Sequence, residues 1–378
     1  MFILNYYKVA LKQKPDYVFL VVTLILVVFG LIMLSSASVV LSYQNFANNY
    51  YYFTHQLLFG VLIGLVAMFV CYKIDYHNWK KFAALMLVLT LVLLVLVFIP
   101  GLGFEYGGAK RWVNLGPLGT IQPTEIAKLT FLLYLATWLD KRSQGIKDWK
   151  YSFAPFLFML AVVGTLTVLQ PDVGTMSVIM LMSIIVYFVA GGKLTHLGIL
   201  GVGAVLMMML LIKIAPYRMS RFTVFLNPEL DPQGIGYQIN QSLLAVGSGG
   251  ILGRGLGKSI QKHNYLPEAS GDSIFAVIAE EMGFVRIIFL LLLFLFFAYL
   301  GFRIAKRAPD MYGKLIATGI TSWVILQALI NISAMISLIP LTGIPLPFIS
   351  YGGSAIIALL AACGIMLNIS KQSLIKND

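Results

Sequence analysis

A short polar stretch before a long apolar run carries the strongest candidate for catalysis. In the segment QKHNYLPEASGDSIFAVIAEE, residues 261–281, Asp272 stands where the polar loop meets the apolar run. Ionisable groups at a membrane boundary are costly to desolvate, so they commonly face a cavity or a partner and are functional candidates. An Asp just before a helix also serves as an N-cap that accepts bonds from backbone N–H groups. Position alone leaves both roles open.

Acids further along the same run share this environment. Glu280 lies eight residues after Asp272, so on one helix the two side chains face broadly the same way. A carboxylate close to lipid can have a raised pKa, and one near neutrality can take a proton from a hydroxyl group. For Glu280 and Glu281, a structural ion pair with a buried cation such as Lys128 or Arg286 is the favoured interpretation.

Cationic side chains in loops on the same predicted face suit a phosphate or pyrophosphate group. Arg forks onto two oxygens, and Lys acts as a point charge. Taken singly, each cation is better explained as a side chain that snorkels to lipid headgroups. Taken together with nearby acids, they favour a substrate site. The cations are Lys110, Arg111, Arg218, Arg221, Arg254, Lys258 and Lys262, and the acids include Glu105, Asp172 and Glu268.

Composition identifies the class of protein that positions these groups. The chain has 378 residues, of which 59% are hydrophobic and 11% charged, far below the charged content of soluble domains. A net charge of +12 would suit nucleic acid, but the cations flank apolar runs on one side, so nucleic acid is not an expected partner. Cys71 and Cys363 lie in apolar runs and are predicted to be buried free thiols. The scattered histidines show no metal-ligand spacing.

The apolar runs predict an all-α polytopic membrane protein with ten transmembrane helices in one domain, residues 1–378. A large extracytoplasmic loop, residues 215–271, separates helices seven and eight. Within it, Tyr237 to Val246 is amphipathic, and GSGGILGRGLG is interpreted as a flexible loop rather than a phosphate cradle. Glu125 and Lys128, three residues apart, are predicted to pair within helix four. The expected spans are 17–37, 56–72, 82–99, 123–139, 153–169, 175–190, 197–214, 273–300, 316–338 and 355–369.

Lys and Arg residues predict the orientation. They concentrate in the N-terminal segment, in the loops 73–81, 141–150 and 303–314, at Lys193 and in the C-terminal tail. Cytoplasmic loops carry such an excess, so both termini are expected in the cytoplasm. The polar loops around Lys110 and the start of the Asp272 span then lie on the outer face of the plasma membrane.

Together the motifs closely resemble the SEDS family (shape, elongation, division and sporulation), membrane peptidoglycan polymerases that include FtsW and RodA. The resemblance covers nearly all of the chain, and the YLPEA wording is more similar to the divisional FtsW branch than to the elongation RodA branch. The matching pieces are GAKRWVNLG with QPTEIAK, QPDVGT, the segment from YRMSRF to EASGD, and PLTGIPLPFISYGGSA.

The resemblance implies glycosyl transfer on lipid II, the undecaprenyl-pyrophosphate disaccharide-pentapeptide. The family's catalytic aspartate matches Asp272, which by implication deprotonates the 4-hydroxyl of the acceptor sugar. The basic loop residues would hold the leaving pyrophosphate, with Glu268 nearby. Supporting roles are expected for Glu125, Lys128, Asp172, Glu280, Ser350, Gly352 and Gly353.

One departure from the family concerns the neighbours of Asp272. Family members usually have His-Thr before this aspartate and Phe after it, whereas here Ser270, Gly271 and Ser273 surround it. Losing an imidazole and a bulky ring would alter the pKa of Asp272 or loosen the site, which puts the rate and the substrate fit in question.

Two other functions stay open at this point. Proline-broken helices and polar residues within spans also suit a lipid II flippase, and the altered neighbours of Asp272 suit a non-catalytic divisome scaffold. The resemblance implies a class B penicillin-binding protein and other divisome membrane proteins as partners, at the division site. No cofactor is written in the sequence, although Mg²⁺ or Mn²⁺ at the pyrophosphate is compatible with it.

Overall fold

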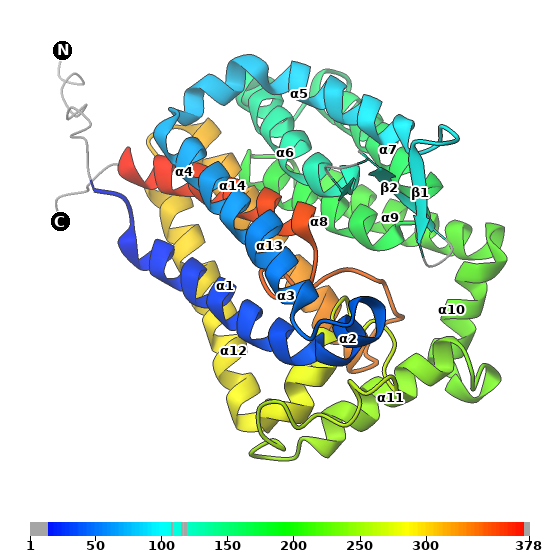
Figure 1. Cartoon of the computed structure of the whole chain (residues 1–378). Coiled ribbons are helices and arrows are strands. Elements are labelled where there is room, and N and C mark those ends of the chain that lie inside the picture. The colour runs from blue at the N-terminus through cyan, green and yellow to red at the C-terminus, as the bar shows by residue number, and fades with distance from the viewer. Residues whose placement is uncertain (1–13, 107–108, 115, 117–118, 374–378) are drawn as a thin grey trace, which may run out of the picture.

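The computed structural model describes residues 14–106, 109–114, 116 and 119–373, and it is a bundle of helices with a small β-sheet at one end (Figure 1). Turns of π-helix over Gln56–Leu62 and Trp149–Phe153 join α3 to α4 and lead into α7, and the 3₁₀ turns are Ser143–Gly145 and Pro228–Leu230. The α-helices are α1 (Tyr17–Ala37), α2 (Val39–Phe46), α3 (Tyr51–His55), α4 (Ile63–Lys73), α5 (Tyr76–Leu96), α6 (Pro123–Lys141), α7 (Ala154–Leu169), α8 (Val173–Val189), α9 (Leu194–Ile214), α10 (Pro216–Leu226), α11 (Ile235–Ser248), α12 (Ile274–Arg307), α13 (Met311–Met335) and α14 (Gly353–Lys371).

The protein is a multi-pass membrane protein, as the apolar runs predicted. Eight helical segments among the described residues are long and apolar enough to cross a bilayer. Helices α6 and α8 occupy the other two predicted spans, but α8 is shorter and α6 carries Glu125 and Lys128 near its start. The count of ten membrane crossings therefore stays a prediction.

Polar side chains start several helices and tie the chain ends to one end of the bundle. Asp16, Asp75 and Asp310 each accept a backbone N–H bond at the start of α1, α5 and α13. The backbone N–H of Asp16 donates to Ser370 Oγ at 3.0 Å. The start of α1 and the end of α14 therefore lie together.

Helices α13 and α14 form the centre of the bundle. In each of them 72% of the apolar stretch is buried, against 6% in α9, which packs mainly on α10 and α8. Because most apolar side chains of α9 are exposed on the surface of the bundle, they are suited to contact lipid. The loops at the ends of α13 and α14 are therefore attached to the most buried helices of the bundle.

Helix α12 is broken at Gly283, whose φ of 73° is open to glycine at little cost. The glycine-rich segment 249–255 fills the break. The N–H groups of Arg254 and Gly255 donate to the carbonyls of Glu280 and Glu281, while Phe284 N–H donates to the carbonyl of Gly250. The expectation of a flexible loop is therefore wrong, because this segment supplies the hydrogen bonds that the broken helix lacks.

The segment before α6 forms a small antiparallel sheet that the all-α expectation did not include. Strands β1 (Gly103–Tyr106), β2 (Ala109–Asn114) and β3 (Thr120–Ile121) pair in the order β1-β2-β3. The sheet fixes the backbone of β2, the strand that carries Arg111, and Figure 1 shows β1 and β2 near α7 and α9.

Candidate active site

Asp272 lies immediately before α12, at the end of the bundle opposite the chain ends. The N-cap position of α12 belongs to Ser273, so the cap role left open for Asp272 does not apply. Asn331 of α13 donates one bond to the carbonyl of Asp272 at 2.7 Å and another to the carbonyl of Ile344 at 2.8 Å. The backbone of Asp272 is thereby held, while its buried Oδ1 has no hydrogen-bond partner among the described residues. An unpaired carboxylate oxygen on a fixed backbone is suited to accept a proton from a bound molecule.

Two arginines from other elements approach this carboxylate. Arg111 on β2 donates to the carbonyls of Gln170 and Pro171, and Arg221 on α10 donates to the carbonyl of Leu341 at 3.2 Å. A methyl group added at Gly343 would lie 3.7 Å from Asp272 Oδ2 and 3.8 Å from Arg111 Nη1. Asp272 and Arg111 therefore lie on one side of the backbone at Gly343.

The surroundings of Asp272 raise the pKa of its carboxyl group to about 7. Burial is the largest cause, the negative charge of Glu268 adds to it, and Arg221 partly opposes it. Burial and the neighbouring Arg111 in turn lower the pKa of Arg221 from its ordinary value. A carboxyl group that titrates near neutrality is matched to general-base work at physiological pH.

Two predicted site residues, Lys262 and Glu280, lie instead in a buried ionic cluster with Glu281. Lys262 Nζ is 2.8 Å from Glu281 Oε1 and donates to Ser36 Oγ on α1. Glu280 accepts bonds from the hydroxyl of Ser259 and from backbone N–H groups of residues 260 and 261, and lies 3.5 Å from Arg254. The expectation of structural ion pairs is confirmed, but the partners named for them, Lys128 and Arg286, are wrong.

The predicted pair of Glu125 and Lys128 is confirmed in α6, with Nζ 2.7 Å from Oε1 and both side chains fully buried. Lys128 also donates to Gln327 Oε1 at 2.8 Å, and Gln327 Nε2 donates to the carbonyl of Pro345. This chain of bonds links α6 and α13 to the 336–352 connection that passes Asp272. The pair therefore helps to hold the 336–352 connection in place beside Asp272.

The remaining predicted residues lie around the site in different ways. Asp172 is the N-cap of α8, accepts from Thr175 N–H at 3.0 Å, and adds its charge to the field at Arg221. Arg218 on α10 donates to the carbonyl of Val168 at 3.1 Å. Lys110, 3.9 Å from Glu105, and Lys258 are exposed on the surface. Their substrate-binding roles stay predictions.

Residues of the 336–352 connection close the site on its other side. Ser350 Oγ accepts from Leu346 N–H at 2.8 Å, and the N–H of Gly352 donates to Gln56 Oε1 at 3.1 Å. Gly353 begins α14. Ser350 and Gly352 thereby hold the turn into α14, and the supporting roles expected of the three residues stay predictions.

Three amides that matter here were missed from the sequence: Gln170, Gln327 and Asn331. Each is buried and bonded to a backbone carbonyl of another segment. The only signal for them was a polar amide within or beside an apolar run, which requires a partner inside the bundle. That signal singles out the residue but not the segment that it bonds.

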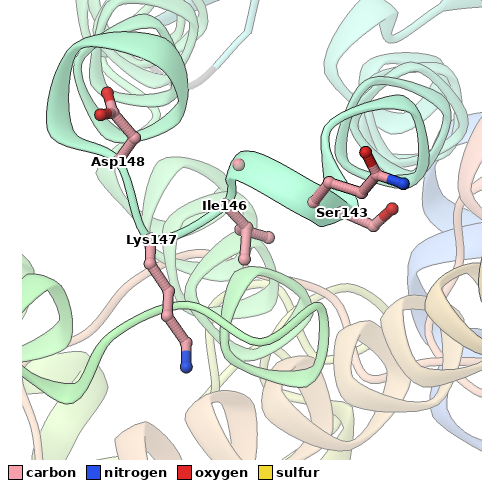
Figure 2. Close-up of a pocket in the computed structure, with 6 residues that line it drawn as sticks. Ser143, Ile146, Lys147 and Asp148 are labelled. Atoms are coloured by element: carbon pink, nitrogen blue, oxygen red, sulfur yellow. The ribbon is translucent and has the colours of Figure 1, made fainter.

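A cavity of about 520 Å³ lies far from these groups, at the loop between α6 and α7 (Figure 2). Its walls come from residues 143–148, and Lys147 and Asp148 point in different directions from it. It contains none of the acids or arginines around Asp272. Among the residues described, no group of three or more His, Cys, Asp or Glu side chains is placed to hold a metal ion. Binding of Mg²⁺ or Mn²⁺ therefore stays a prediction.

Comparison with known proteins gives consistent results over nearly the whole chain. The family model FTSW_RODA_SPOVE, described as "Cell cycle protein", matches residues 16–374. Stage V sporulation protein E of Bacillus subtilis is 42% identical over 96% of this chain and 98% of its own length. A probable peptidoglycan glycosyltransferase FtsW of Trichlorobacter lovleyi is 41% identical over 94% of this chain and 93% of its own.

Solved structures share the fold. A chain from "Structural coordination of polymerization and crosslinking by a peptidoglycan synthase complex" is 28% identical, with a TM-score of 0.76 over 94% of this chain and 97% of its own. The rod shape determining protein RodA of Thermus thermophilus is 27% identical, with a TM-score of 0.69 over 96% of this chain and 98% of its own. The fold of this chain is therefore known from experimentally determined structures.

Proposed function

Because this chain belongs to the FtsW, RodA and SpoVE family of cell cycle proteins, we propose that it is a membrane glycosyltransferase that polymerises lipid II into peptidoglycan strands. The observation that carries the proposal is the unpaired Oδ1 of Asp272, on a backbone that Asn331 holds, with Arg111 on the same side of Gly343. A base and a phosphate-binding cation are the two groups that transfer from a sugar pyrophosphate requires.

The reaction follows from the positions of these groups. The carboxylate of Asp272 takes the proton from the 4-hydroxyl of the acceptor sugar as that oxygen bonds to the anomeric carbon of the donor. The bond between the anomeric carbon and the pyrophosphate oxygen breaks, and undecaprenyl pyrophosphate leaves with the electron pair. Arg111 and Arg221 stabilise the negative charge that develops on the leaving group, because both guanidinium groups are fixed by backbone carbonyls beforehand.

Lipid II polymerisation by the purified protein tests the proposal. Asp272→Asn keeps the shape of the side chain and removes the base, so strand synthesis should stop while folding and membrane insertion persist. Glu229→Gln is the matched control, since it neutralises an exposed carboxylate in the same long loop. Undiminished synthesis by Asp272→Asn, or equal loss in both variants, contradicts the assignment of Asp272 as the base.

The setting in the cell belongs to the same proposal. The cations at the loops of one end favour cytoplasmic termini, with Asp272 on the outer face of the plasma membrane. We assign a class B penicillin-binding protein as the partner, supported by the resemblance to a chain of a peptidoglycan synthase complex. The FtsW names favour the division site and the Bacillus subtilis relative favours sporulation, so a fluorescent fusion imaged during division and during spore formation distinguishes the two.

A further inference from the structure

The site at Asp272 has two sides of different chemistry. One side, the cationic wall, consists of Arg111 and Arg221. The other, which we call the aromatic wall, consists of Phe46, Tyr51, Tyr52, His55 and Tyr351. Figure 1 shows α2 and α3, which carry most of the aromatic wall, on one side of the 336–352 connection, and α10, which carries Arg221, on the other.

The rings of the aromatic wall are packed on one another. Phe46 and Tyr51 stack with centroids 3.6 Å apart and planes 16° apart, and Tyr52 meets Phe46 edge-on at 5.7 Å. Asn45 Nδ2 donates to the hydroxyl of Tyr52 at 3.2 Å. Phe46 keeps 45% of its surface exposed, so one ring of the stack remains open to a ligand.

Tyr351 joins this wall to the backbone that carries the catalytic group. Its ring lies 5.0 Å from that of Tyr52, edge to face, and its hydroxyl is 3.0 Å from His55 Nδ1. Its backbone N–H donates to the carbonyl of Ser270 at 2.9 Å, two residues before Asp272. The position of the aromatic wall relative to Asp272 is therefore fixed by direct bonds.

The absence of charge from this wall indicates what it binds. Residues 38–72 contain no Lys, Arg, Asp or Glu, whereas the amides Gln44, Asn45, Asn48 and Asn49 flank Phe46 in the sequence, and Asn45 bonds to the hydroxyl of Tyr52. Phosphate requires cations, which are on the opposite wall. A sugar instead presents a C–H face that stacks on an aromatic ring, and hydroxyl and acetamido groups that bond to amides.

We propose that the aromatic wall binds the sugars of the acceptor glycan strand, while the cationic wall takes the pyrophosphate of the donor. The assignment rests on the proposed glycosyl transfer and adds to it the direction in which the strand lies. The acceptor hydroxyl then reaches Asp272 from the side of α2 and α3. Aromatic rings at membrane surfaces also anchor proteins at lipid headgroups. Lipid headgroups are therefore the alternative occupant of the aromatic wall, and the experiment below distinguishes them from a sugar.

A binding experiment in the inactive Asp272→Asn protein tests the assignment without any reaction. The probe is chitotetraose, a soluble β-1,4-linked N-acetylglucosamine oligomer without lipid or phosphate, with binding followed by calorimetry and by saturation-transfer NMR. Phe46→Leu keeps an apolar side chain but removes the ring face, so binding should weaken about tenfold. Phe46→Tyr restores the ring and should restore binding. Tyr299→Leu is the matched control, since Tyr299 is an exposed ring stacked on Phe296 along α12.

Each result decides between the two occupants. Weaker chitotetraose binding in Phe46→Leu, with binding unchanged in Phe46→Tyr and in Tyr299→Leu, supports the sugar site. Equal binding in Phe46→Leu and the parent, or no binding by the parent at millimolar probe, overturns it and leaves lipid anchoring as the role of the rings. Weaker chitotetraose binding in Phe46→Leu, found alongside undiminished polymerisation by the Asp272→Asn protein, would contradict the assignment of Asp272 as the base and leave the sugar site standing.

Discussion

Asp272 experiences opposing influences, because burial and Glu268 raise the pKa of its carboxyl group while Arg221 lowers it. A general base works only when deprotonated, so the rate of strand synthesis should rise with pH along a limb centred near 7. Glu268→Gln removes a charge that raises the pKa and should move this limb to lower pH. The pH dependence of lipid II consumption measures both. A limb that stays in place in Glu268→Gln contradicts the electrostatic account.

The same raised pKa affects stability with a sign opposite to that of a salt-bridged acid. Between the unfolded value of 3.8 and the folded value of about 7, the folded protein holds a proton that the unfolded chain has released. Stability from this group is therefore complete below the unfolded pKa and is lost as pH rises through 7. Asp272 is thus a residue at which function costs stability at neutral pH.

At the scale of elements, the break in α12 depends on two glycines that meet face to face. A Cβ at Gly253 would lie 2.3 Å from the carbonyl oxygen of Glu281, a clash with backbone. Gly257 has nearly the same φ, 81° against 79°, but nothing lies within 4 Å of its added Cβ. Gly253→Ala should therefore lower the unfolding temperature much more than Gly257→Ala, which should cost only the left-handed strain, about 1–2 kcal/mol. Thermal unfolding in detergent compares the two, and similar losses would show that the packing at the break is unimportant.

The sequence predicted the positions of the helices better than their partners. Apolar runs, helix caps such as Asp16 and Asp75, and a proline in the first turn such as Pro123 are local signals, and α1 begins and ends at the predicted residues. The break at Gly283 leaves hydropathy unchanged, so no apolar pattern could reveal it. The partner of Glu281 was missed because Lys262 reaches it through a folded loop, while Lys128, the expected partner, was already paired within its own helix.

At the site, too, the sequence predicted local features better than contacts between distant segments. The position of Asp272 at the membrane boundary singled it out but left the cap role open, and the family resemblance implied its role as the base. The arginines were recognised as a class. Which of them approach Asp272 depends on β2 and α10, whose placement beside α12 results from packing and not from local sequence. Asn331 and the aromatic wall likewise become visible only when α13, α3 and the 336–352 connection are brought together.

Across the whole molecule, Lys262 and Glu281 join the long loop to α1 through Ser36. Both charges are buried, so Lys262→Met leaves an uncompensated carboxylate and should lower the free energy of unfolding by roughly 3–5 kcal/mol. The double variant Lys262→Met with Glu281→Gln removes both charges and should recover much of that loss. Unfolding in detergent gives both values, and a double variant as unstable as the single one would indicate that specific bonds to Lys262 matter more than the charge.

The two ends of the bundle carry different parts of the chain, so labelling each end tests the orientation of the protein in the membrane. Asp16 and Ser370 place the start of α1 and the end of α14 together, while Asn48 lies with the aromatic wall at the Asp272 end and Gln144 in the exposed loop between α6 and α7. Since Cys71 and Cys363 are buried, the native chain offers a low background for thiol labelling. In intact cells a membrane-impermeant maleimide should label Asn48→Cys and should label Gln144→Cys only after permeabilisation. The reverse pattern would place Asp272 in the cytoplasm, where the pyrophosphate of a translocated donor cannot reach it.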